Sequence, residues 1–87
     1  MEKKVYSVYD AKAEGYLDPF MAMTDGLAIR MFASAANDAQ HDFHRYAADY
    51  TLFRIGTYHV DTGFYTQDQA HTNLGTALSM IGVLESK

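Results

Sequence analysis

The clearest hydrophobic pattern in the chain runs from Asp49 to Thr66, where β-branched and aromatic residues predominate on both sides of a short polar turn. The segment DYTLFRIGTYHVDTGFYT is typical of a long β-strand and a return strand, because such side chains fit a half-buried pleated surface. Asp61-Thr62-Gly63 supplies the turn, since glycine accepts the positive φ that a three-residue hairpin loop usually needs. The pattern therefore predicts a β-hairpin.

One charged residue, Arg54, indicates which side of the first hairpin strand faces solvent. Strict alternation places Arg54 on one side together with Tyr50, Leu52, Gly56 and Tyr58. We therefore expect the other side to face the core, and it consists of Thr51, Phe53, Ile55 and Thr57.

The first part of the chain predicts two more strands. Lys3 to Asp10 alternates, and both of its sides are partly apolar, which is typical of a central strand. Ala11 to Asp18 has no clean period and contains Gly15, so we interpret it as a connection. Pro19 then favours an extended entry into a short strand from Phe20 to Met23.

A helix is predicted to begin at Thr24 or Asp25, because either side chain can accept a hydrogen bond from a free amide of the first turn. Its apolar residues recur at three- and four-residue spacing and form one stripe that we expect to pack on the sheet. The stripe consists of Leu27, Ala28, Met31, Phe32, Ala35 and Ala36. The pattern lapses at Asn37-Asp38, and asparagine tolerates the left-handed conformation that often ends a helix.

The remaining segments carry weaker patterns. Ala39 to Asp49 fits either one helical turn around Asp42 to Ala48 or a loop pinned by its aromatic residues. Gln67 to Thr72 is polar. Behind a cap at Asn73, helical spacing is found for Leu74, Ala77, Leu78 and Ile81. We therefore expect a short C-terminal helix or tail.

In chain order these elements predict a β-β-α-β-β core in residues 1–66 and a C-terminal segment in residues 67–87 of a single domain. This order is typical of an α+β fold, in which one main helix packs on one face of a small antiparallel sheet of about four strands. The second face would carry Tyr6 and Tyr58 beside Arg54, with Tyr65 as a further candidate. Because water accommodates such an aromatic surface poorly, we expect that face to be covered at least part of the time.

Composition narrows the classes of function. A chain of 87 residues has a small core, so we expect marginal stability unless it oligomerises. The formal net charge of −4 means that any nucleic-acid binding has to come from a local patch. Cysteine is absent, which excludes disulfides and thiolate chemistry. The sequence has neither a long apolar run nor a signal-peptide pattern, so we expect a protein that is not exported and does not enter a membrane.

Three blocks in this order, VYSVYDAKAEGY, PFMAMTDGLAIRMF and DYTLFRIGTYHVDTG, resemble the small nonstructural protein of gokushovirus-type microviruses, which are phages with single-stranded DNA genomes. The resemblance covers roughly Lys4 to Phe64. It implies a DNA-binding protein of the host cytoplasm that is absent from the virion and takes part in genome replication or the switch to packaging. It brings no catalytic or base-contacting residues.

Cations and tyrosines are the candidate contacts to single-stranded DNA, because bases stack on aromatic rings while cations follow the backbone. The candidates are Lys3, Lys4, Lys12, Tyr6, Arg30, Arg45, Arg54, Tyr58 and Tyr65. Tyrosine and arginine are also typical of a homodimer interface, which the acidic charge and the small size favour. The alternative function is therefore a dimeric adaptor that binds a viral or host replication protein without touching DNA.

Other chemistry has little support in the sequence. His41 and His44 lie three residues apart, but no pattern fixes a third ligand, so we predict no metal site. There is no nucleophile motif and no glycine-rich phosphate loop. The aspartates are better explained as turn and cap residues than as paired acids. We expect neither an enzyme nor a cofactor.

Overall fold

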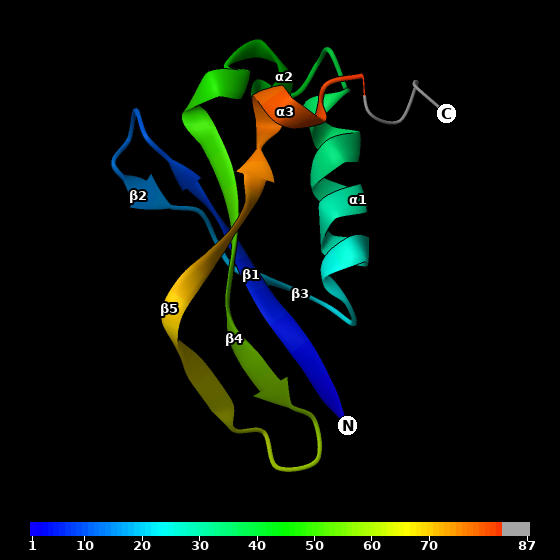
Figure 1. Cartoon of the computed structure of the whole chain (residues 1–87), viewed down its shortest axis with the longest axis vertical. Coiled ribbons are helices and arrows are strands. Elements are labelled where there is room, and N and C mark those ends of the chain that lie inside the picture. The colour runs from blue at the N-terminus through cyan, green and yellow to red at the C-terminus, as the bar shows by residue number, and fades with distance from the viewer. Residues whose placement is uncertain (83–87) are drawn as a thin grey trace.

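The computed structural model describes residues 1–82, in which helices cover one face of an antiparallel sheet (Figure 1). The strands are β1 (Glu2–Asp10), β2 (Gly15–Tyr16), β3 (Phe20–Ala22), β4 (Tyr50–His59) and β5 (Tyr65–Thr76). The helices are α1 (Asp25–Ala36), α2 (Asp42–Arg45) and α3 (Ala77–Met80), with a 3₁₀ turn, η1 (Ala47–Asp49). The predicted α+β class is confirmed, with five strands in the described residues instead of about four.

β1 lies at the centre of the sheet, as its two apolar sides predict. It pairs with β4 along one edge and with β2 and β3 along the other, and β5 pairs with β4. The short β2 falls inside the segment interpreted as a connection, where Tyr16 pairs with Tyr9. Two residues are too few for any period to be visible in the sequence.

The core lies between α1 and the sheet, but α1 buries only part of the predicted stripe. Ala28, Phe32 and Ala36 are buried as expected, and Ala33 joins them. Leu27 and Met31, expected in the core, are 41% and 53% exposed. Alanine side chains let the helix approach the sheet closely, whereas a face made of leucine and methionine would hold it further away.

Both ends of α1 lie where the sequence predicts them. The Thr24 hydroxyl accepts a hydrogen bond from the amide of Leu27 at 3.2 Å, which confirms the N-cap. Asn37 follows the last helical residue, but its φ of −93° shows that the expected left-handed conformation was wrong. Its side-chain amide instead donates to the carbonyls of Ala33 and Met80, so Asn37 ends the helix by linking it to α3.

The orientation predicted for β4 was wrong. Tyr50 and Leu52 are buried in the core beneath α1, and Arg54 lies on the same side, paired with Asp25 at the start of α1. Phe53 is half-buried on the side away from α1. The arginine taken to mark the solvent side is accommodated on the helix side because a carboxylate meets it there.

A bulge then changes the phase of β4. Tyr6 pairs with Arg54, and Val5 pairs with Gly56, so Ile55 is an extra residue with no partner in β1. A bulge of this kind shifts the alternation of all later side chains. Tyr58 consequently lies near Val5 on the side away from α1, although strict alternation grouped it with Arg54.

The C-terminal part of the described chain is more extended than predicted. β5 runs through the polar segment from Gln67 to Thr72 and past Asn73, which we expected to cap a helix. Because β5 is an edge strand and mostly exposed, its side chains need no apolar period. The predicted helix is a single turn, α3, capped by Thr76. Before β4, the helical alternative for Ala39 to Asp49 is the correct one, since α2 and η1 lie there.

Candidate functional site

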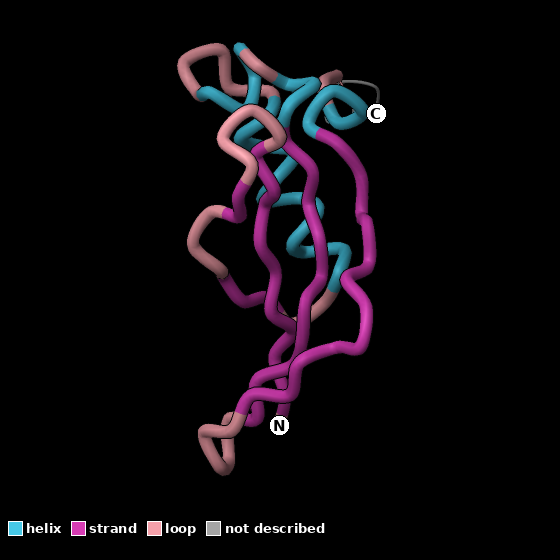
Figure 2. The backbone as a smooth tube through the Cα atoms, turned by 90° about the vertical axis from the view of Figure 1, so that its left-hand side faces the viewer, coloured by secondary structure: helices cyan, strands magenta, loops and turns pink. Residues whose placement is uncertain are grey.

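The sheet has one face that no helix covers in the described residues, and we call it the open face (Figure 2). In Figure 2 the strands lie in front of α1. Register places Val5, Ser7 and Tyr9 of β1 on this face, opposite the side on which Tyr6 and Val8 enter the core. Aromatic side chains gather on the open face in two clusters.

The first cluster is centred on Tyr16 of β2. Its ring centroid lies 4.9 Å from that of Tyr9, 5.9 Å from that of Phe53 and 5.4 Å from that of His71. The Tyr16 hydroxyl is also 3.1 Å from Nδ1 of His71 on β5. The four rings therefore span β1, β2, β4 and β5, and Tyr16 remains 47% exposed.

The second cluster surrounds a shallow groove of about 390 Å³ toward the hairpin end of the sheet. Its lining consists of Val5, Pro19, Met21, Ile55, Tyr58 and Tyr65. The Tyr65 ring packs over Gly56, where an added Cβ would lie 2.5 Å from the ring, and its hydroxyl donates to the carbonyl of Ile55 at 3.1 Å. Tyr65 is also 47% exposed, so both clusters present a ring to solvent.

The sequence reasoning missed Tyr9, Tyr16, Phe53 and His71 as candidate site residues. Phe53 was assigned to the core because of the inverted orientation of β4, and Tyr16 was assigned to a connection. The alternation of β1 did place Tyr9 together with Val5 and Ser7. That alternation was the available signal, but it did not say which side of β1 a helix would cover.

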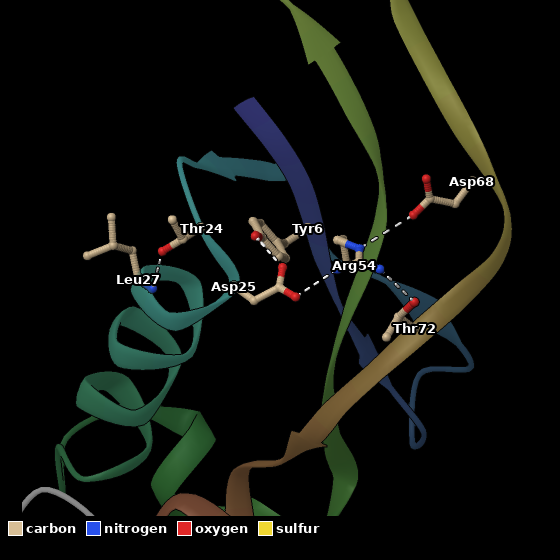
Figure 3. Close-up of polar contacts among 7 residues, drawn as sticks. All are labelled: Tyr6, Thr24, Asp25, Leu27, Arg54, Asp68 and Thr72. Carbon is tan, nitrogen blue, oxygen red and sulfur yellow. Dashed lines mark hydrogen bonds and ion pairs between the residues drawn. The ribbon is translucent and has the colours of Figure 1, made fainter. Parts of the chain in front are cut away.

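Tyr6 and Arg54, two of the predicted contacts, lie inside a polar network on the helix side of the sheet (Figure 3). The Tyr6 hydroxyl donates to Oδ1 of Asp25 at 2.8 Å, and Nη1 of Arg54 donates to Oδ2 of the same carboxylate at 2.7 Å. Arg54 also lies 3.6 Å from Asp68 and donates to the Thr72 hydroxyl at 3.3 Å. Because Tyr6 is fully buried, its ring cannot stack on a base.

The network affects the ionisation of Tyr6. Burial, followed by the hydrogen bond to Asp25 and the negative charge of that carboxylate, raises the pKa of the Tyr6 hydroxyl well above its ordinary value. The positive charge of Arg54 opposes this shift but does not cancel it. Tyr6 is therefore a neutral structural donor that fixes the first turn of α1 to β1.

The other predicted cations are dispersed over the molecule. Lys3 alternates with Val5 and lies at the edge of the open face, whereas Lys4 points to the opposite side of β1. Arg45 pairs with Asp42 on α2, and Lys12 lies in the turn after β1. Arg30 belongs to α1, so these cations and the tyrosines do not form one continuous surface.

Apart from Glu2, the first residue of β1, the sheet and α1 fall within residues 3–80, and over this range the chain matches the family model described as phage ORF5 protein. The chain belongs to the phage ORF5 protein family. Comparison with curated proteins and with solved structures found no match. The family membership confirms a phage protein, as the three sequence blocks indicated.

The remaining histidines of this phage ORF5 protein, His41, His44 and His59, make local contacts, and Nε2 of His59 lies 2.8 Å from the Thr66 hydroxyl. His41 caps α2 by accepting a hydrogen bond from the amide of Phe43 at 3.0 Å, and Nδ1 of His44 lies 2.9 Å from the carbonyl of Ala36. Within residues 1–82 no three His, Cys, Asp or Glu side chains group as ligands for a metal ion. No helix of the described residues is long and apolar enough to cross a membrane.

Proposed function

We propose that this phage protein is a non-enzymatic accessory factor of gokushovirus-type microviruses that binds single-stranded DNA in genome replication or in the switch to packaging. The observation that supports this function is the uncovered aromatic surface of the sheet. Aromatic side chains on an open sheet are a recurring platform for splayed bases in single-stranded nucleic-acid recognition.

Stacking is expected to dominate the affinity. Each base stacked on an aromatic ring contributes about 1–3 kcal/mol. Tyr16 and Tyr65 each present an exposed ring, and Lys3 is the cation at the edge of the same face. With one or two phosphate contacts, the logarithm of the binding constant should fall with the logarithm of salt concentration with a slope of about −1.

The test is a fluorescence anisotropy titration with labelled oligothymidylate at several salt concentrations. Tyr16→Ala and Tyr65→Ala should each weaken binding by about 5- to 150-fold, which corresponds to the free energy of one stacked base. Tyr46→Ala is the matched control, because Tyr46 is exposed but lies at the end of α2, outside both clusters. Undetectable binding at low salt, binding without salt dependence, or an equal loss with Tyr46→Ala would refute the proposal.

The second candidate is a dimeric adaptor for a viral or host replication protein, supported by the apolar lining of the groove beside Tyr58 and Tyr65. Two copies that met through this groove would cover both open faces at once. Sedimentation of Tyr58→Glu tests this function, since a carboxylate at that position would separate the two copies. A dimer of unchanged strength would place the interface elsewhere, and a monomeric parent protein would exclude this candidate.

A further inference from the structure

We infer that a second groove, at the edge of the sheet between β3 and α1, is a docking site for an acidic amphipathic helix of a partner protein. This inference goes beyond the proposed DNA-binding function and rests mainly on other side chains, although Lys3 and Met21 also border the open face. The groove has a volume of about 340 Å³ and lies where β3 leads into α1. Its principal side chains are Met21, Met23, Leu27 and Met31, with Lys3 and Arg30 as its charged members.

The apolar part of this groove is exposed without a role in the core. Leu27 and Met31 are one helical turn apart on α1, yet they belong to the side that α1 turns away from the sheet. Met21 and Met23 are exposed to a similar extent and lie across the groove from that ridge. Methionine side chains are flexible and polarisable, and surfaces rich in them adapt to apolar side chains of varied shape.

The charge of the groove specifies the chemistry of its partner. Lys3 and Arg30 are both positive, and no acidic side chain lines the groove. Neither cation forms an ion pair within residues 1–82, although the whole chain has a net charge of −4. A partner that brings carboxylates next to apolar side chains therefore complements the groove, whereas a basic partner would be repelled.

A helix is the form of partner that fits best. The ridge made by Leu27 and Met31 has the i, i+4 spacing along which a second helix can pack its own side chains. Helices that bind in such grooves insert apolar residues at positions i, i+3 or i+4, and i+7. Glutamate or aspartate beside those positions would meet the positive charges of Arg30 and Lys3.

The experiment uses two fluorescein-labelled peptides of about 18 residues, a length that allows an isolated helix in water. Both have leucine at helical spacing, and the remaining positions alternate between alanine and glutamate in one peptide and between alanine and lysine in the other. The acidic peptide should bind the full chain and the basic peptide should not. Binding of both peptides with equal affinity, or of neither, would overturn the inference.

Two variants locate the binding. Arg30→Glu and Met31→Ser should each lower the affinity for the acidic peptide by about tenfold. Arg30→Glu removes charge complementarity, and Met31→Ser removes apolar contact. Both side chains are exposed, so each variant should keep the circular dichroism of the parent. Arg45→Glu on α2 is the matched charge control and should leave the affinity unchanged. An equal loss with Arg45→Glu would mean that the attraction is a property of net charge alone.

A second readout does not depend on variants. In protein labelled on the methionine methyl groups, the acidic peptide should shift the signals of Met21, Met23 and Met31 but not that of buried Met80. The same three shifts produced by oligothymidylate would make the groove a nucleic-acid site. Shifts produced by raising the protein concentration alone would make a second copy of the chain its occupant. Either of these results would overturn the inference.

Discussion

Leu52 and Phe53 are neighbours on β4 that distinguish the observed orientation of the strand from the opposite one. Leu52 is fully buried against α1, whereas Phe53 is half-buried on the open face. Truncating a fully buried leucine to alanine removes its transfer free energy and leaves a cavity, which costs about 2–5 kcal/mol. A domain of 87 residues has a stability of about 4–13 kcal/mol, so Leu52→Ala removes a large fraction of the total.

Phe53→Ala should cost less although it removes more atoms. Full burial of such a side chain stabilises by about 1.5–3 kcal/mol, so a half-buried ring contributes about 1–1.5 kcal/mol. In a domain of this size each kcal/mol lowers Tm by about 4–8 °C. Thermal unfolding followed by circular dichroism should therefore give a decrease of about 8–40 °C for Leu52→Ala and about 4–12 °C for Phe53→Ala.

The opposite ranking would refute the reasoning. If Phe53 were a core residue, its truncation would cost about 3–5 kcal/mol and Leu52→Ala would be nearly neutral. β4 would then have the orientation that strict alternation around Arg54 predicts. The aromatic surface assigned to the open face would lie under α1, and the DNA-binding proposal would lose its support.

Three further predictions concern the polar network and the bulge. Asp25→Ala should lower the free energy of unfolding by about 2–3 kcal/mol, because Tyr6 and Arg54 lose their shared acceptor. Asp42→Ala removes only an exposed ion pair and should cost less than about 0.5 kcal/mol. If urea denaturation gave Asp25→Ala and Asp42→Ala the same loss of unfolding free energy, this account would be contradicted. Because the pKa of Tyr6 is raised in the folded state, its contribution to stability is complete below about pH 10 and is lost as the pH rises through the folded-state pKa. Tyr6→Phe should accordingly make the decline of Tm at alkaline pH shallower. If the decline were unchanged, titration of other groups would be its cause. Gly56→Ala should lower Tm, since its Cβ would lie 2.5 Å from the Tyr65 ring. Gly26→Ala in α1 would meet only the Thr24 hydroxyl oxygen at 3.8 Å, an ordinary contact, and should stabilise by about 0.4–1 kcal/mol. If calorimetry showed that Gly56→Ala and Gly26→Ala change Tm in the same direction, the predicted difference would be contradicted.

The sequence predicted the features that depend on local interactions. The cap at Thr24 and the end of α1 near Asn37 follow from side chains that bond to their own helix. The hairpin turn at Gly63 follows from a positive φ of 77°, which glycine adopts without strain. β1 was predicted to be central because both of its sides carry apolar residues, a pattern typical of strands in the middle of a sheet.

The orientation of the sheet could not be predicted, because it depends on contacts between distant residues. Arg54 lies on the helix side only because Asp25 and Asp68, far away in the sequence, provide its counter-charges. The phase of the second half of β4 depends on the bulge at Ile55, which no residue type marks. The polar β5 was missed for a different reason, since an exposed edge strand has no apolar side that would produce a period.

The polar network and the open face are structurally connected through β4. Asp25 holds Tyr6 of β1 and Arg54 of β4, and Arg54 reaches Asp68 and Thr72 of β5, so one cluster joins α1 to three adjacent strands (Figure 3). The bulge follows Arg54 immediately, and it turns Tyr58 to the same side as Phe53. The residues up to Arg54 thus dock the helix, and the residues after it extend the aromatic surface toward the hairpin. Because both roles meet at adjacent positions of one strand, the fixed position of Arg54 keeps α1 on one face of the sheet and leaves the other face without a covering helix in the described residues.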